Sequence, residues 1–106
     1  MPLVFEASLS DVTCGSNNTA NFTCTLNRTP SQDLEWRKDG QKLRIDGKKY
    51  SVVKEDAGLT LSINRISEDD AGLYSVYLNS NTFSSAQLNI ERILRNYLLE
   101  VVSYLW

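Results

Sequence analysis

The sequence contains no histidine, and it has only two cysteines, two prolines and one methionine among its 106 residues. Without histidine, the chain offers no His-based catalytic triad and no general base whose ordinary pKa lies near neutrality. Two cysteines without histidine also cannot complete a tetrahedral Cys/His zinc site. Five glycines and two prolines exclude collagen-like and linker-like sequence. We therefore expect a protein that is not an enzyme and that holds no cofactor and no metal.

An excess of charge of one sign is also missing, because 11 Lys and Arg residues face 13 Asp and Glu residues, for a net charge of −2. This balance gives no electrostatic attraction to DNA, RNA or an anionic membrane surface. No apolar run reaches the roughly 18 to 20 residues that cross a bilayer, and the N-terminus lacks the basic and apolar regions of a signal peptide. We expect a protein partner, and neither a nucleic acid nor a membrane. The length and a hydrophobic content of 42% fit one domain with one core.

Alternation of apolar and polar residues dominates the chain as far as Glu91. Each such run is typical of a strand with one buried face. The clearest runs cover 20–26, 34–37, 59–63, 74–79 and 85–90. Shorter strands are expected at 4–9, 11–14 and 50–54, and a turn is expected at 38–41. Short strands with one polar face, separated by turns, predict an all-β antiparallel sandwich.

Several motifs in this pattern resemble those of an immunoglobulin domain of the I-set type. Cys24 and Trp36, twelve residues apart, match the strand B cysteine and the buried strand C tryptophan of that family. The run Asp-Ala-Gly-Leu-Tyr at 70–74 matches its D-x-G-x-Y signature and makes Tyr74 the tyrosine of the corner motif. The resemblance implies an I-set domain over residues 1–91. Its expected core signature is Cys24, Trp36, Leu61, Asp70, Tyr74 and Val76.

One departure from the family pattern concerns its second cysteine, which would fall at the position of Val76. The resemblance therefore implies a sandwich without the inter-sheet disulfide, with Cys24, Trp36 and Val76 packed together. Cys14 precedes a turn at 15–19, and we expect it to lie opposite Ala20 in a hairpin. That position is too far from Cys24 for a relaxed disulfide. Both cysteines are predicted to be free thiols.

Free thiols favour a reducing compartment. I-set domains that lack one of the two cysteines resemble those of sarcomeric scaffold proteins, namely the titin, obscurin, myomesin and myosin-binding protein families. The resemblance implies a structural, protein-binding module of muscle or the cytoskeleton, located in the cytoplasm. Mechanical load on such a module would shear the hydrogen bonds between its terminal strands, at Phe5–Leu9 and Gln87–Glu91.

A competing signal comes from N-x-T triplets, which are acceptors for N-glycans in secreted proteins. They begin at Asn17, Asn21 and Asn27. A strand-forming segment rich in Asn and Thr also produces such triplets by chance. The alternative function is accordingly an extracellular cell-adhesion or receptor domain that bears N-glycans.

Other polar and aromatic groups have simpler interpretations. The acidic run at 68–70 lacks the spacing of a calcium loop, and Asp70 is expected to pair with Arg65 or Lys49. Arg44 and the lysines at 48–49 are expected to form a solvated basic edge. Tyr77 alternates outward and Phe83 follows the 79–82 hairpin, so both are candidates for partner binding if they are exposed.

Residues 92–106 depart from the strand pattern, and their apolar residues recur with the spacing of an amphipathic helix. We expect this C-terminal extension to mediate self-association, giving a homo-oligomer, or docking to a partner. Alternatives are that the extension packs on its own sandwich, contacts a membrane surface, pairs as a strand over 101–106, or originates as a fused peptide. The partner-binding candidates in this extension are Ile93, Leu94, Tyr97, Leu98, Val101, Val102 and Leu105.

Overall fold

The computed structural model describes residues 2–91, and nine β-strands with one 3₁₀ turn make up its regular structure. The strands are β1 (Phe5–Ala7), β2 (Val12–Gly15), β3 (Ala20–Leu26), β4 (Glu35–Lys38), β5 (Gln41–Lys42), β6 (Tyr50–Glu55), β7 (Gly58–Ile63), β8 (Gly72–Asn79) and β9 (Thr82–Glu91). The 3₁₀ turn η1 (Glu68–Asp70) lies between β7 and β8. All eight expected strands are present, so the all-β prediction is confirmed. The expected helix over 92–106, and every candidate residue in it, lies outside the described residues.

Alternation explains why these segments form strands. In β3 the side chains of Ala20, Phe22, Cys24 and Leu26 are buried, whereas Asn21 and Thr23 face solvent. The same pattern recurs in β7, where Leu59, Leu61 and Ile63 are buried. One face of each strand therefore supplies the core, as period-two spacing requires.

Strand β5 was not expected, because the prediction assigned 38–41 to a turn. The turn is tighter than that and consists of Asp39 and Gly40, whose φ angles are 50° and 85°. Positive φ at both central residues is the geometry of a two-residue hairpin, for which Asp-Gly is a favoured sequence. Gln41 therefore pairs directly with Lys38, and Lys42 with Arg37.

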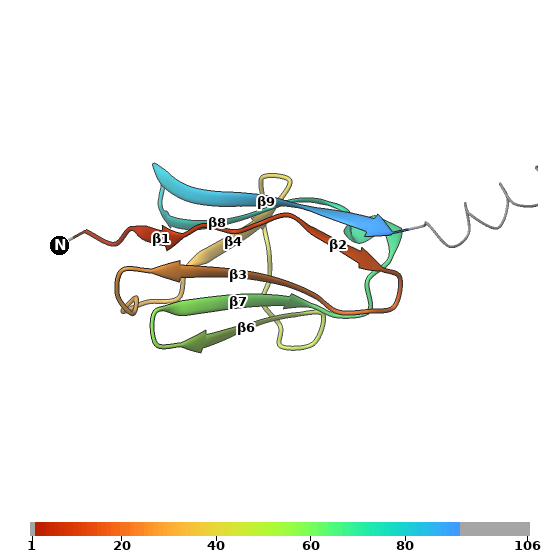
Figure 1. Ribbon diagram of the computed structural model, residues 1–106, viewed down its shortest axis with the longest axis horizontal. Helices are drawn as coiled ribbons and strands as arrows, with labels where there is room; N and C mark the ends of the chain where they lie inside the picture. Colours follow the sequence, from red (N-terminus) through yellow and green to blue (C-terminus); the bar gives the residue numbers. More distant parts are fainter. Residues whose placement is uncertain (1, 92–106) are drawn as a thin grey trace, which may run out of the picture.

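The strands form two sheets that face each other across the core (Figure 1). The four-stranded sheet has the order β1-β3-β7-β6, and the five-stranded sheet has the order β2-β9-β8-β4-β5. The N-terminal end of β1 and the C-terminal end of β9 lie at opposite ends of the sandwich (Figure 1). A force applied to the two termini would therefore run along the strands.

The expectation of purely antiparallel pairing is wrong for one pair, because β2 runs parallel to β9. The N-terminal segment changes sheets between β1, which pairs with β3, and β2. Two contacts hold it at the crossing: the backbone N–H of Leu9 donates to Ser84 Oγ at 2.9 Å, and that of Gln87 donates to Asp11 Oδ1 at 2.7 Å. After the crossing, the N-terminal segment continues as β2, which lies beside β9 and runs parallel to it.

This crossing also corrects the expected surroundings of Cys14. Its partner is Ile90 of β9, and it is not opposite Ala20, because β2 and β3 belong to different sheets. Both cysteines are buried free thiols, as predicted. Cys24, Trp36 and Val76 all belong to the buried apolar cluster that fills the sandwich. Burial raises the pKa of Cys24 to about 11.

A hydrogen-bonded corner closes one end of the core. The hydroxyl of Tyr74 donates to the backbone oxygen of Asp70 at 2.6 Å, which is the expected tyrosine-corner contact. Lys49 Nζ donates to Asp70 Oδ2 at 2.8 Å, so the expected partner of Asp70 is Lys49 and not Arg65. Burial of Asp70 raises its pKa, but hydrogen bonds from Lys49 and from the Ser67 N–H outweigh that effect and hold the pKa below its ordinary value. The corner thereby links Lys49, which precedes β6, to the turn η1, which precedes β8.

Candidate protein-binding site

The site begins with two aromatic side chains that the hairpin of β8 and β9 places side by side. Tyr77 and Phe83 are direct cross-strand partners, and the loop between the strands is only the turn at 80–81. Their rings stack with centroids 4.8 Å apart and planes inclined by 25°. Phe83 is 52% exposed, and Tyr77 is half-buried. Both residues thus lie on the outer surface of the five-stranded sheet, away from the core.

A charged pair from β4 completes this aromatic group. Glu35 is the direct partner of Tyr77 in the sheet, so Arg37, two residues further on, reaches Tyr77 along the diagonal. The Arg37 guanidinium lies 4.3 Å from the centre of the Tyr77 ring, a cation–π contact. Arg37 Nε also donates to the carboxylate of Glu35, and this bond raises the pKa of Arg37 above its ordinary value. We call Glu35, Arg37, Tyr77 and Phe83 the aromatic patch.

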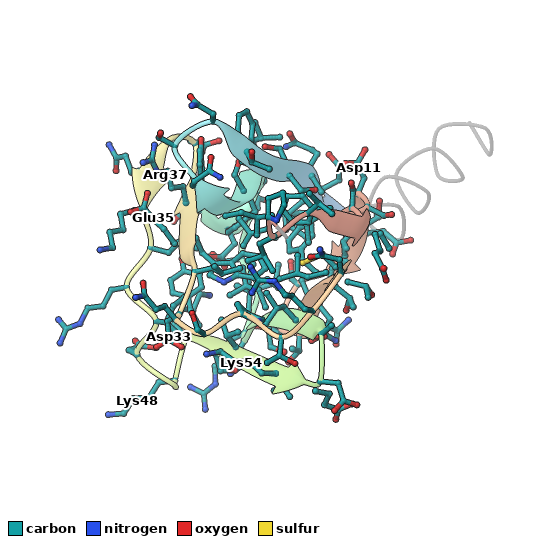
Figure 2. All side chains as sticks on the ribbon, turned by 90° about the vertical axis from the view of Figure 1, so that its left-hand side faces the viewer. Asp11, Asp33, Glu35, Arg37, Lys48 and Lys54 are labelled. Carbon is teal, nitrogen blue, oxygen red and sulfur yellow. The ribbon has the colours of Figure 1, made fainter. Side chains whose placement is uncertain are left out.

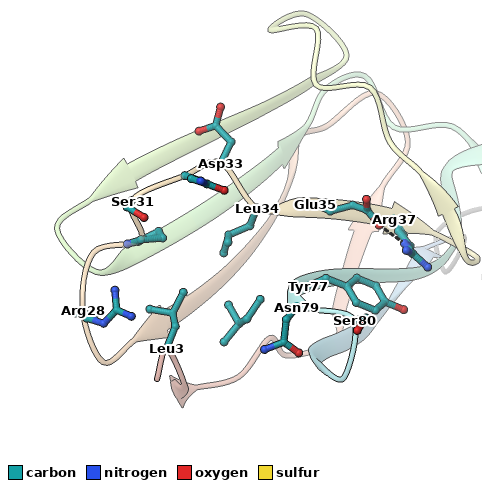
Figure 3. A pocket seen from close by; sticks show the side chains of 13 residues that line it. Leu3, Arg28, Ser31, Asp33, Leu34, Glu35, Arg37, Tyr77, Asn79 and Ser80 are labelled. Atoms are coloured by element: carbon teal, nitrogen blue, oxygen red, sulfur yellow. Dashed lines mark hydrogen bonds and ion pairs between the residues drawn. The ribbon is translucent and has the colours of Figure 1, made fainter. Parts of the chain in front are cut away.

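A hollow of about 400 Å³ adjoins the aromatic patch at the end of the sandwich (Figure 3). Its walls come from the N-terminal segment, the connection at 28–34, β4 and the end of β8. Leu3 and Leu34 give it apolar surface, whereas Arg28 and Asn79 are polar and lie at its rim (Figure 3). The lining of the hollow is mixed, with more polar than apolar surface, and it borders the stacked rings and the ion-paired Arg37; aromatic and arginine side chains are enriched in protein–protein contacts.

The acidic run at 68–70 has a structural role. Asp70 points inward to Lys49 and Ser67, so its carboxylate is engaged within the corner. The run does not group into a metal site, and no cluster of three or more metal-ligating side chains occurs among residues 2–91. Within the same range, no helix is long and apolar enough to cross a membrane.

The residues of the expected core signature are all buried in the structure. They are Cys24, Trp36, Leu61, Asp70, Tyr74 and Val76. Of the partner-binding candidates, the structure describes Tyr77 and Phe83 and brings them together. It adds Arg37 and Glu35, which the sequence did not single out because their place beside Tyr77 depends on the register of β4 against β8.

The sequence is similar to single domains of much longer proteins. It is 33% identical to the muscle M-line assembly protein unc-89 of Caenorhabditis elegans over 66 residues, which is 62% of this chain and 1% of that protein. It is 26% identical to rat (Rattus norvegicus) palladin over 90 residues, 85% of this chain and 15% of that protein. It is 39% identical to vascular endothelial growth factor receptor 3 of Danio rerio over 67 residues, 57% of this chain and 5% of the receptor.

Solved structures of titin domains have the same fold. Titin domain I10 superposes with a TM-score of 0.78 at 21% identity, covering 86% of this chain and 100% of that domain. Titin domain M7 superposes with a TM-score of 0.72 at 27% identity, covering 85% of this chain and 94% of M7. The family model for the immunoglobulin I-set domain matches residues 3–91. With a two-sheet sandwich, a tyrosine corner and a family match over most of its length, the chain belongs to the immunoglobulin I-set domain family.

Proposed function

We propose that this chain is a non-catalytic, load-bearing and protein-binding module of a muscle or cytoskeletal scaffold protein. The observation that carries the proposal is the parallel ladder between β2 and β9, which pairs Val12 with Leu88 and Gly15 with Glu91. These strands belong to the two ends of the chain, and the ends point away from each other (Figure 1). Force along the chain would load this ladder in shear, with several hydrogen bonds resisting together.

The expected location of that ladder needs one correction. It was placed between Phe5–Leu9 and Gln87–Glu91, whereas Phe5 and Ala7 pair with β3, and only the later segment β2 pairs with β9. Force on the N-terminus therefore reaches the short β1–β3 pairing first and the longer β2–β9 ladder after the sheet crossing.

The core is filled without a disulfide, which agrees with a reducing compartment. Cys24 and Val76 are both fully buried, so the sandwich is filled at the position of the family disulfide without a covalent bond. Secreted domains of this size usually keep such cross-links. Similarity to unc-89 and palladin supports the same location.

Single-molecule pulling with handles fused to both ends tests the mechanical part of the proposal. We expect one cooperative unfolding event at a force well above that of chain stretching. Unfolding at negligible force would overturn the load-bearing role.

A second candidate function is an extracellular receptor or adhesion domain with N-glycans. The exposed acceptors Asn17 and Asn21 favour it, as does the similarity to a growth factor receptor. Intact-mass measurement of the chain secreted from a glycosylating host separates the candidates, because poor secretion of an unmodified chain would count against the extracellular function.

We also propose that residues 1–91 form the domain and that residues 92–106 form an amphipathic helix for self-association or partner docking. The family match over residues 3–91 supports the domain, and the apolar spacing of the sequence is the support for the helix. Light scattering on a sizing column, comparing the whole chain with one ending at Glu91, provides the test. A larger species formed by the whole chain, but not by the chain ending at Glu91, would support self-association. If both chains are monomeric, self-association is excluded.

A further inference from the structure

A second surface, distinct from the aromatic patch, lies along the side of the sandwich where β5 and β6 are the outermost strands. Each of these strands has a hydrogen-bonded neighbour on one side only among the described residues. The chain between them, residues 43–49, crosses from one sheet to the other. Outermost strands carry unpaired backbone N–H and C=O groups, which can pair with an extended segment of another chain.

The exposed side chains on this side carry positive charge. Lys42, Arg44 and Lys48 are exposed, and none of them forms an ion pair within residues 2–91. We call these three residues the basic edge. Figure 2 shows Lys48 on the opposite side of the sandwich from Asp11, with Glu35 and Asp33 on the same side as Lys48; these two carboxylates are ion-paired, with Arg37 and Lys54. Residues 42–48 carry three cationic side chains and one carboxylate, that of Asp46, so this segment has a local excess of positive charge although the net charge of the chain is −2.

Asp46 lies between Arg44 and Lys48 in the chain, and its carboxylate accepts hydrogen bonds from the backbone. Asp46 Oδ1 accepts the backbone N–H of Lys48 at 2.9 Å and that of Tyr50 at 3.2 Å. These hydrogen bonds lower the pKa of Asp46 below its ordinary value, so it stays ionised while it holds the loop. Asp46 consequently shapes the loop that presents Arg44 and Lys48 and forms no ion pair with either side chain.

An apolar hollow opens between the two sheets beside the basic edge. Its volume is about 170 Å³, close to the roughly 150 Å³ of an apolar cavity that takes up benzene. The ion pair between Lys54 and Asp33 contributes to its lining, and Ile45 is 40% exposed. The apolar lining is Leu34, Trp36, Ile45, Val52 and Leu59. One branched apolar side chain of a partner fits such a space.

We propose that the basic edge and this hollow together bind an acidic, extended segment of a partner protein that carries one apolar anchor residue. Acidic residues of the segment pair with Lys42, Arg44 and Lys48, and the anchor enters the hollow beside Ile45. The free edge of β6 offers backbone partners along the same line. Charge complementarity selects the acidic segment, and the hollow distinguishes a peptide with an anchor from a featureless polyanion.

Fluorescence anisotropy of labelled peptides with the full chain tests the proposal. The probe is a peptide with one central leucine flanked on each side by four glutamates. One comparison peptide has lysine in place of glutamate, and another has serine in place of leucine. We expect the acidic leucine peptide to bind at least about tenfold more tightly than either, with affinity that falls as salt rises.

Variants of the chain localise the binding. The double variant Arg44→Gln/Lys48→Gln should weaken the acidic leucine peptide by about tenfold or more. The matched control Ser10→Glu/Ser16→Glu changes the net charge by the same amount at exposed positions elsewhere and should leave the affinity unchanged. Ile45→Asp should abolish the preference for leucine over serine. Circular dichroism confirms that each variant is folded.

Three results would contradict the proposed binding of an acidic segment. Equal or undetectable binding of the three peptides would overturn the proposal, and the lysines would then serve only to prevent pairing of the outer strands. Binding to vesicles that contain phosphatidylserine, without binding of the acidic leucine peptide, would also overturn it in favour of a lipid surface. An equal loss in the Ser10→Glu/Ser16→Glu control would show that only total charge matters.

Discussion

At the scale of single residues, Asp70 joins three parts of the structure around the tyrosine corner. Its side chain accepts hydrogen bonds from Lys49 Nζ and the Ser67 N–H, and its backbone oxygen accepts from Tyr74. A buried carboxylate with such partners stabilises the folded state only while it is ionised. The stability of the domain should therefore depend on this group at low pH.

Asp70→Asn should lower the free energy of unfolding at pH 7 by about 1–2 kcal/mol, because the bond to Lys49 loses its charge. The lowered pKa of Asp70 stabilises the fold above the unfolded value of about 3.9, and this stabilisation is lost as pH falls through the lowered pKa. The difference between wild type and variant should accordingly shrink below about pH 4. Urea denaturation at a series of pH values measures it, with Asp69→Asn, an exposed neighbour, as control. A difference that is constant with pH would contradict this account of Asp70.

Val76 is the second informative residue, because it fills the position of the family's second cysteine. Val76→Cys should form a disulfide with Cys24 when the chain folds under oxidising conditions. Closing a loop of about 50 residues should stabilise the fold by about 4 kcal/mol on the chain-entropy model. Thiol titration and denaturation with and without reductant provide the measurement. Ser75→Cys is the matched control, since Ser75 bonds Ser85 on the other face of the sheet. Three free thiols in the oxidised Val76→Cys variant, in place of the single thiol of Cys14, would show that positions 24 and 76 do not face each other closely enough.

At the scale of elements, the β8–β9 hairpin supplies the two aromatic residues of the aromatic patch. Tyr77 and Phe83 stack on the outer face, whereas Phe22 and Tyr74 pack inside with ring centroids 5.3 Å apart. The two aromatic pairs therefore have different roles. The inner pair fills the core, whereas the outer pair lies on the surface of the sheet.

Phe83→Ser should reduce the free energy of unfolding by no more than about 1 kcal/mol, the value of a surface cross-strand pair. Phe22→Ala, at a fully buried position, should cost about 3–5 kcal/mol. Thermal and chemical denaturation of both variants provide the comparison. Similar losses in the two variants would mean that the outer pair is a structural element and not a surface reserved for binding.

Local pattern predicted most strands and one part of the site. Alternation identified β3 and β7 closely, and the outward phase of Tyr77 together with the hairpin position of Phe83 identified half of the aromatic patch. Pattern did not predict the parallel pairing of β2, which depends on contacts between Leu9 and Ser84 and between Asp11 and Gln87. These partners are 75 and 76 residues apart in sequence, beyond the reach of any local rule. The same limit applies to Arg37 over Tyr77 and to the hollow beside Ile45, because each requires the register of distant strands.

At the scale of the whole molecule, the surroundings of the three N-x-T triplets differ. The side chains of Asn17 and Asn21 are exposed. Asn27 is half-buried, its Nδ2 donates to the Pro2 oxygen at 3.0 Å, and its Oδ1 accepts the Val4 N–H at 2.9 Å. A glycan on Asn27 Nδ2 would disrupt the attachment of the N-terminal segment.

A chain directed into the secretory pathway should therefore acquire glycans at Asn17 and Asn21 and remain unmodified at Asn27. Intact mass and peptide mapping provide the measurement, with Asn17→Gln/Asn21→Gln as the control that should carry no glycan. Full occupancy of Asn27 would show that its hydrogen bonds are not needed during folding. A chain that folds in the cytosol would carry none of these modifications.

The load path is a property of the whole sandwich, because force that enters at one end leaves at the other through β2 and β9. Since β2 is an outermost strand, its successive N–H groups point alternately toward β9 and toward solvent. Proline removes the donor of the residue that it replaces. Val12→Pro and Thr13→Pro are therefore a matched pair, and one of them removes a donor from the ladder while the other removes a donor that faces solvent.

End-to-end pulling of these two variants beside the wild type tests the load-bearing account most directly. If the β2–β9 ladder bears the load, one variant unfolds at a clearly lower force and the other unfolds near the wild-type force. Unchanged force in both variants would contradict it, because the β2–β9 ladder would then not be the structure that resists extension.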